Sequence, residues 1–170
     1  CGFPLCKGNI MASNPQWCLS LNEWKSQFTT WVRVPQPEAL LNASIFFDFR
    51  SLFGKAELAE QMRRHLLAQA GGNALFLQAM ARNALTVSPP LGKIRDFITD
   101  LEPDHPGKID LKKYGSRIFV DVARIYALAT GVHNTNSVQR LRQVGKLLAI
   151  RDEEIDAILE GLDFIQLLRL

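Results

Sequence analysis

The strongest pattern of hydrophobic positions in the chain lies between Ile109 and Gly131. Apolar side chains recur there at spacings of four, three and four residues, which is one face of an α-helix, and they are Ile118, Val122, Ile125 and Ala129. The pattern predicts a central helix that packs this face against the core. A loop with two lysines, Lys112 and Lys113, leads into the predicted helix, and Gly131 is placed to end it.

A second, charged stripe runs along the same predicted helix and consists of Arg117, Asp121 and Arg124. Spacings of four and three residues bring these side chains close enough to form an internal ladder of ion pairs. The alternative is that the two arginines, together with the preceding lysines, present positive charge to a phosphate. The pattern by itself favours the ladder, because charged stripes on helices usually meet solvent.

Six more segments carry helical spacing of apolar residues or a helix-start signal. They are Leu21–Val34, Leu40–Phe53, Ala56–Ala70, Ala74–Leu85, Ser137–Ala149 and a last helix from Asp152, which is expected to cap it. Ser20 followed by Glu23 is a capping box, and Asn73 and Asn136 are placed to cap the helices after them.

One of these segments has two interpretations. The run from Ser44 to Phe49 has strand propensity, but the inward spacing of four, four and three residues across Leu41, Ile45, Phe49 and Leu52 favours a helix. With this helix included, the pattern predicts an all-α, multi-helix bundle.

Composition narrows the class of protein. The chain has 170 residues, enough for one ordinary domain or somewhat more, and a formal net charge of +3. Its basic residues are scattered apart from Arg63, Arg64 and His65, so nucleic acid is not an expected partner. No apolar run approaches the length that crosses a bilayer, and the start has no signal-peptide pattern, so a membrane is not expected either.

The cysteines and the two ends of the chain add further expectations. Cys1, Cys6 and Cys18 lack C-x-x-C spacing and have no histidine nearby, so a zinc site is not expected. Reduced thiols fit better, and they favour a cytoplasmic location. The chain begins at Cys1 without Met, and a helical pattern is still running at Leu170, so we expect a piece of a larger protein.

Side chains with catalytic chemistry form no familiar motif, because G-x-S-x-G, H-E-x-x-H, Walker and G-x-G-x-x-G patterns are all missing. Asp48 and Arg50 lie in a predicted apolar helix, where one could reach a metal and the other a phosphate. The pattern favours structural anchors, because buried charges are usually paired.

Tryptophans recur every seven residues, at Trp17, Trp24 and Trp31. They could form a stacking platform for a base, but aromatic residues at helical spacing favour a packed seam.

Several blocks of the sequence resemble, in the same order, a group of bacterial nucleotidyltransferases. The blocks are CGFPLCKGNIMASNPQW, a tryptophan-rich helix, PEALLNASIFFDFRSLFG and IDLKKYGSRIFVDVARIYAL. Members of the group often carry cyclic-nucleotide-binding and CBS domains upstream. The group is similar to the uridylyltransferase that modifies the nitrogen-regulatory P-II protein, and the resemblance covers nearly the whole chain.

The resemblance implies two parts. Residues 1–54 would be the end of an α/β nucleotidyltransferase domain, and residues 55–170 a helical domain that closes the nucleotide cleft. Polymerase-beta-like nucleotidyltransferases hold magnesium with two acidic residues one apart after a Gly-Ser pair. The only such pair here, Gly115-Ser116, is followed nearby by the single Asp121, so we expect no metal site in this chain and no activity of the chain alone.

The same resemblance points to particular residues. The block around Lys112 is similar to a Lys-containing, Gly-rich, Arg-containing motif of the P-II uridylyltransferases, although the double Gly of that motif is missing. Lys112 and Arg117 become candidates for triphosphate or base contacts, and Arg124 for stabilising phosphate charge. Asp48 and Arg50 are further candidates near the cleft. The phosphate-facing role and the internal ladder both stay open.

The expected function is the nucleotide-closing and substrate-positioning part of a nucleotidyltransferase. The complete protein would move UMP or AMP from a nucleoside triphosphate to a regulatory protein or a small acceptor, with Mg²⁺ as its cofactor. The alternative is a helical regulatory module that relays signals from upstream cyclic-nucleotide-binding or CBS domains. A homodimer through the apolar stripe of Ile155–Leu170 would suit that alternative.

Overall fold

The computed structural model describes residues 8, 10–11, 14–92, 98–99 and 106–169. This part of the chain contains seven α-helices and no β-strand, which confirms the predicted all-α, multi-helix bundle. The helices are α1 (Leu21–Arg33), α2 (Pro37–Phe46), α3 (Ala56–Gly71), α4 (Ala74–Ala84), α5 (Arg117–Thr130), α6 (Ser137–Leu147) and α7 (Asp152–Leu167). A 3-10 helix, η1 (Pro15–Trp17), precedes α1, and a π-helical turn, η2 (Lys112–Ser116), precedes α5. Within these described residues, no helix has both the length and the apolar composition that crossing a bilayer requires.

Polar side chains begin three of the helices as the sequence predicts. Ser20 and Glu23 form the capping box of α1, with the Ser20 N–H donating to Glu23 Oε2 at 2.7 Å. The side chains of Asn73 and Asn136 accept backbone N–H groups at the starts of α4 and α6. Asp152 is the first residue of α7 rather than its cap, so that prediction is wrong by one position.

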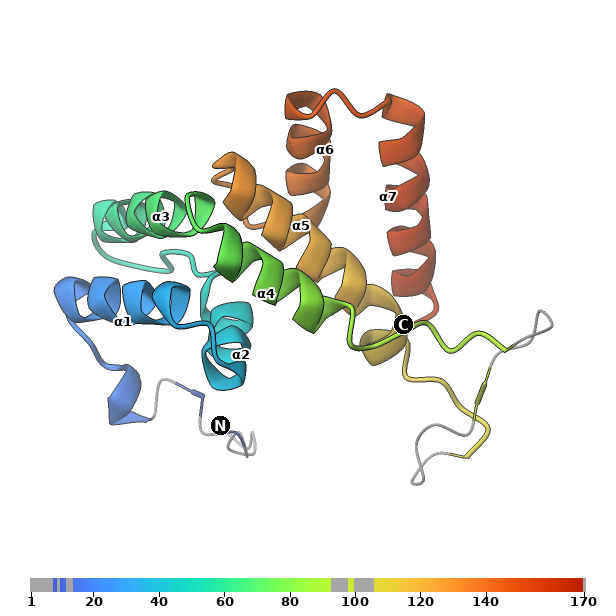
Figure 1. Cartoon of the computed structure of the whole chain (residues 1–170), viewed down its shortest axis with the longest axis horizontal. Helices are drawn as coiled ribbons and strands as arrows, with labels where there is room; N and C mark the ends of the chain where they lie inside the picture. The colour runs from blue at the N-terminus through green and yellow to red at the C-terminus, as the bar shows by residue number, and fades with distance from the viewer. Residues whose placement is uncertain (1–7, 9, 12–13, 93–97, 100–105, 170) are drawn as a thin grey trace.

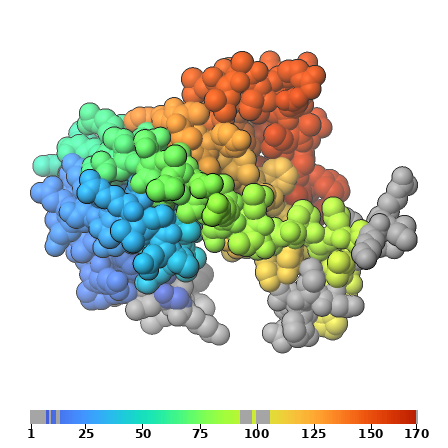
Figure 2. Space-filling view, viewed as in Figure 1, coloured from blue at the N-terminus to red at the C-terminus, as the bar shows by residue number. Residues whose placement is uncertain are grey.

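Helix α5 lies at the centre of the arrangement (Figure 1) and packs against α3, α4 and α6. Helix α1 lies against α2 and α3, and α4 contacts α2, α3 and α5. Helices α6 and α7 form an antiparallel pair, and α7 returns to η2 at the start of α5. In the space-filling view this pair projects from the body that the first five helices form (Figure 2).

The main core lies among α1–α4 and is rich in aromatic rings. Its largest fully buried side chains are Phe47, Phe76, Leu66 and Val32. Trp17 and Trp24 pack against this core, and the ring centroids of Trp24 and Trp31 are 6.4 Å apart. The tryptophans therefore form the packed seam that their spacing favours. Because the core joins residues from both sides of position 54, nothing in it separates two domains there, and that division stays a prediction.

Helix α2 is shorter than predicted, because it ends at Phe46 and not at Phe53. Three of the side chains predicted to point inward are exposed, and they are Leu41, Ile45 and Leu52. The buried residues of α2 are instead Ala39, Leu40, Asn42 and Ala43. The predicted helix is therefore wrong over its second half, and its predicted inward face is wrong as well.

Arg63 of α3 explains why the chain leaves the helix at this point. Its guanidinium donates hydrogen bonds to the carbonyl oxygens of Phe47, at 2.7 Å, and Phe49. The end of a helix leaves carbonyl groups without partners, and here a side chain from another helix supplies the donors. Phe47 can then enter the core completely, and the next residue, Asp48, is free to reach α5.

Helix α5 also differs from the expectation. Its buried residues are Asp121, Ala123, Arg124, Ala127 and Leu128, so two of the three charged residues face inward, while Arg117 stays exposed. The apolar stripe that was predicted to face the core is only partly buried, and Ala129 in that stripe is exposed. The two lysines lie in the helical turn η2 rather than in a loop, whereas Gly131 ends the helix as predicted, with a φ of 74°.

Candidate functional site

A pocket of about 520 Å³ lies at the start of α5, where η2, α2 and the end of the chain meet. Its charged lining consists of the cations Lys112, Lys113, Arg117, Arg124 and Arg169 and the carboxylates Asp110 and Asp121. We call it the cationic pocket. It brings together the three phosphate-binding candidates from the sequence, and its excess of positive charge favours an anionic ligand.

Asp110 fixes the turn that carries the two lysines. Its Oδ1 accepts the backbone N–H groups of Lys112, at 2.8 Å, and Lys113, at 2.9 Å. The hydrogen bond from the Lys113 backbone N–H, supported by that from Lys112 and by the charges of both lysines, holds the pKa of the Asp110 carboxyl below its ordinary value. One carboxylate oxygen thus holds the backbone of the turn, and the Lys112 side chain stays exposed at the pocket.

The end of the chain closes one side of the pocket. A Cβ atom at Gly115 would lie 3.0 Å from Ile165 Cγ2, so the absence of a side chain there lets α7 approach η2. Beyond α7, Arg169 donates from Nη1 to Ser116 Oγ at 3.0 Å. Arg169 thus reaches the pocket from 53 residues further along the chain, and no sequence pattern had singled it out.

The predicted ladder along α5 is present. Arg117 Nε lies 3.4 Å from Asp121 Oδ2, and Arg124 Nη1 donates to Asp121 Oδ1 at 2.7 Å. The two arginines differ in exposure, because the side chain of Arg117 is 43% exposed and that of Arg124 only 6%. Arg117 can therefore still meet a ligand, whereas Arg124 is part of the pocket wall.

Asp48 joins α2 to α5 and α6. Its Oδ2 accepts from Arg124 Nε and Nη2, at 3.1 and 2.7 Å, and its Oδ1 lies 2.6 Å from Arg140 Nη2. Burial raises the pKa of this carboxyl, but the charge of Arg124 and the hydrogen bonds from both arginines outweigh burial and bring the pKa below its ordinary value. Asp48 is the structural anchor that the sequence favours. We call Asp48, Asp121, Arg124 and Arg140 the ion cluster.

Two buried arginines, neither of which was predicted as a site residue, hold Asp48 in place. Arg63 binds the carbonyl groups on both sides of Asp48, and its guanidinium carbon lies 4.1 Å from the centroid of the Phe49 ring. Arg140 is 2% exposed and donates from Nε to the carbonyl oxygen of Asn134 at 2.6 Å. Burial, and then the positive charge of Arg140, lower the pKa of Arg63.

The pattern of apolar positions along the helices contains a signal that these two arginines are buried. Arg63 follows the buried Met62 of α3, and Arg140 precedes the buried Leu141 of α6. A charge next to the inward positions of a helix is a candidate for burial with a partner. The pattern does not say which acidic residue that partner is.

Arg50 is not brought to the cationic pocket. It lines a separate small cavity of about 250 Å³, together with Glu60, Arg63 and His133. His133 Nδ1 lies 3.3 Å from Glu60 Oε1, and both side chains are half exposed. Asp48 and Arg50 therefore serve different places, Asp48 in its contacts with Arg124 and Arg140 and Arg50 at this small cavity.

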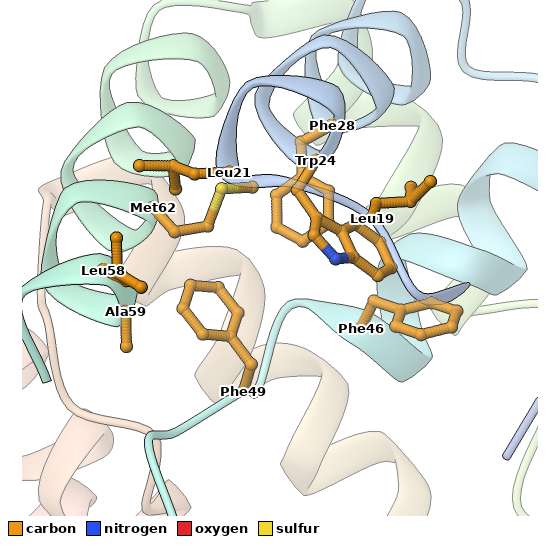
Figure 3. A pocket seen from close by; sticks show the side chains of 9 residues that line it. All are labelled: Leu19, Leu21, Trp24, Phe28, Phe46, Phe49, Leu58, Ala59 and Met62. Atoms are coloured by element: carbon orange, nitrogen blue, oxygen red, sulfur yellow. The ribbon is translucent and has the colours of Figure 1, made fainter. Parts of the chain in front are cut away.

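A third pocket, of about 330 Å³, is apolar (Figure 3). Side chains from α1, α2 and α3, such as Trp24 and Met62, line it together with Phe49 of the connection after α2, and none of its lining residues is charged. Without a cation it offers nothing to neutralise a phosphate. The cationic pocket is therefore the better candidate for the site that the sequence predicts.

Carboxylates that could bind a metal are engaged elsewhere. Within the described ranges, no group of three or more His, Cys, Asp or Glu side chains is close enough to hold an ion. Asp48 and Asp121 both accept hydrogen bonds from arginines, and Asp110 accepts them from the backbone. These residues do not fit a magnesium site.

Two family models match the chain. The model described as "Putative nucleotidyltransferase substrate binding domain" matches residues 74–170, which is more than half of the chain and contains η2, α5 and Arg169. The model described as "Putative nucleotidyltransferase DUF294" matches residues 1–38. No curated protein and no solved structure matches the chain.

Proposed function

The chain belongs to the nucleotidyltransferase family that these two models describe, and we propose that its cationic pocket binds the triphosphate of the nucleotide substrate. In the complete protein, the acceptor oxygen would attack the α-phosphorus, the bond to the β-phosphate oxygen would break, and pyrophosphate would leave. The group transferred would be UMP or AMP, and the acceptor a regulatory protein or a small molecule.

The observation that carries the proposal is the exposed pair Lys112 and Arg117 on one wall of a pocket with excess positive charge. A lysine ammonium is a point charge, and an arginine guanidinium is a planar fork that matches two phosphate oxygens. Fixed cations aimed at a triphosphate stabilise the charge that builds up on the leaving pyrophosphate.

Arg124 takes a different role in this proposal. Its Nε, Nη1 and Nη2 all donate to Asp48 or Asp121, and its side chain is only 6% exposed, so two carboxylates already neutralise the charge that a phosphate would need. We assign Arg124 as a positioning residue, which holds Asp121 and, through it, Arg117 at the pocket wall.

Magnesium belongs to the proposal only for the complete protein. The described carboxylates of this chain do not fit a magnesium site, so the acidic residues that hold the ion would lie elsewhere. Upstream cyclic-nucleotide-binding or CBS domains would then regulate the transfer, which makes them proposed partners within the same protein.

Calorimetric titration of ATP and UTP into the complete protein tests the proposed phosphate contact. Removing one charge-assisted contact costs about 1.5 kcal/mol or more, so Lys112→Ala and Arg117→Ala should each weaken binding about tenfold. Arg142→Ala is the matched control, because Arg142 is an exposed arginine on α6 outside the pocket. It should leave the affinity unchanged.

Unchanged affinity in both pocket variants would overturn the proposal. That result would favour the alternative from the sequence, a helical module that relays signals between other domains. A loss of affinity shared by Arg142→Ala would point to general electrostatic attraction and would also count against a specific phosphate site.

A further inference from the structure

The cationic pocket supplies hydrogen-bond donors but has few acceptors left. Asp110 Oδ1 accepts two backbone N–H groups, and both oxygens of Asp121 accept from Arg117 and Arg124, which leaves Oδ2 of Asp110 as the carboxylate oxygen with no donor among these contacts. Ser116 Oγ already accepts from Arg169. Phosphate oxygens accept hydrogen bonds only, whereas the edges of nucleobases present both donors and acceptors. The pocket therefore matches phosphate better than it matches a base edge.

Within the described part of the chain, aromatic rings do not line the cationic pocket, although the Tyr114 ring centroid lies 4.9 Å from Nζ of the lining residue Lys113. No aromatic side chain is found among the described residues that line the cationic pocket, where the apolar contribution comes from Val120. The tryptophans are packed among α1–α4, around the apolar pocket and the core. Stacking on an aromatic ring stabilises a bound base by about 1–3 kcal/mol, and this contribution is missing here.

Arg169 completes the set of donors. It is exposed and lines the pocket, and among the described residues its guanidinium makes one hydrogen bond, from Nη1 to Ser116 Oγ, which leaves the other N–H donors available. With Lys112 and Arg117 it forms a group of three exposed cations that come from η2, α5 and the end of the chain. Three cations around one cavity suit a ligand with several negative charges better than a single phosphate.

We propose that the cationic pocket recognises the polyphosphate chain of its ligand through Lys112, Arg117 and Arg169 and does not read the base. The proposal rests on the proposed function, and it goes further in two ways. It adds Arg169 to the binding residues, and it assigns any preference between UTP and ATP to residues outside this pocket.

The test compares the same variants with three probes. Inorganic triphosphate, ATP and UTP are titrated calorimetrically into the complete protein and into Lys112→Ala, Arg117→Ala and Arg169→Gln. Each variant should lose about tenfold in affinity, and the loss should agree within about threefold for the three probes, because each deleted contact is to phosphate. Arg151→Gln, at the other end of α7, is the control and should change nothing. Because fold-losses are compared, a base preference from another part of the protein cancels.

Each result has a definite meaning. A loss for ATP or UTP that exceeds the loss for triphosphate by more than about tenfold would show that the side chain reads the nucleoside, and would overturn this inference while the proposed function stands. Full affinity in Arg169→Gln, with losses in the other two variants, would remove Arg169 from the site. If no variant affects any probe, the proposed function itself fails. Thermal unfolding of each variant shows whether a loss comes from binding or from folding.

Discussion

Phe47 and Asp48 are neighbours in the sequence, yet they serve two different kinds of buried region. Phe47 is fully buried in the aromatic core, with its ring centroid 4.8 Å from that of Phe28 and 6.1 Å from that of Phe76. Asp48 belongs to the ion cluster and contacts Arg124 and Arg140. One residue holds α2 against α1 and α4, and the next holds it against α5 and α6.

The two regions hold helices together by different physics. Burial of apolar rings is favourable in any orientation that packs well, so the core depends mainly on volume and shape. The ion cluster depends on every partner, because a charge that loses its partner remains buried and uncompensated. The core should therefore respond to lost volume, and the cluster to lost charge at constant volume.

Phe47→Ala should have the largest effect on stability. Removing a fully buried phenylalanine side chain leaves a cavity and costs about 4 kcal/mol in the free energy of unfolding. Phe53→Ala is the control, because Phe53 is 99% exposed in the connection that follows. Urea denaturation followed by circular dichroism measures both. A loss below about 1 kcal/mol for Phe47→Ala would contradict the position of this ring in the core.

Asp48→Asn should come next, although it changes almost no volume. It leaves Arg124 and Arg140 without their shared carboxylate, and we expect a loss of about 3 kcal/mol in the free energy of unfolding, because Asp48 is still 25% exposed. Asp156→Asn breaks a surface pair with Arg142 and should cost no more than about 1 kcal/mol. Equal effects of the two substitutions would mean that the ion cluster is no more important than a surface pair.

Gly145→Ala tests the contact between α6 and α7. This contact depends on close approach of the two helices and not on aromatic rings or buried charges. A Cβ atom at Gly145 would lie 2.7 Å from Ile155 Cγ1, so we expect a loss of about 2 kcal/mol from overpacking between α6 and α7. Gly161→Ala is the matched control, because its Cβ atom would meet Phe119 Cζ at an ordinary 3.5 Å. The control should gain up to about 1 kcal/mol from helix propensity, and the opposite signs should appear as opposite shifts of the melting temperature.

Acid should weaken the ion cluster without touching the aromatic core, and this is the smallest of the four effects. The pKa of Asp48 is below its ordinary value of 3.8 in the folded chain, so its contribution is complete above that value and is lost as the pH falls through the folded pKa. The stability difference between the native chain and Asp48→Asn should therefore be greatest near neutral pH and shrink in acid. A difference that stays constant down to about pH 2 would contradict the proposed ionisation of Asp48.

Patterns of apolar and capping residues a few positions apart predict much of the fold. The helices α1, α3, α4 and α6 lie close to their predicted bounds, because apolar spacing, the capping box at Ser20 and the two asparagine caps are all local signals. The end of α2 could not be predicted in the same way. It depends on hydrogen bonds from Arg63, which lies 16 residues after the Phe47 carbonyl that it binds.

The candidate site likewise contains residues that the sequence predicted and one that only the tertiary structure revealed. Lys112, Arg117 and Arg124 were named from a motif-like block and from the family resemblance, and the structure brings all three to one pocket. It also distinguishes them, since Arg124 is engaged by Asp48 and Asp121 while Arg117 stays exposed. Arg169 has no neighbouring motif, so only its hydrogen bond to Ser116 reveals that it belongs there.

The order of the helices, most of their starting points and the resemblance to nucleotidyltransferases were readable from the sequence by itself, because each depends on residues a few positions apart. The tertiary structure alone decided which face of α5 is buried. Asp121 and Arg124 of its charged stripe lie inside because Asp48, 76 residues before Arg124, supplies a carboxylate that compensates the buried charge of that arginine. Spacing along one helix says which side chains share a face, and only the partners that arrive from elsewhere in the chain determine whether that face meets water or the interior.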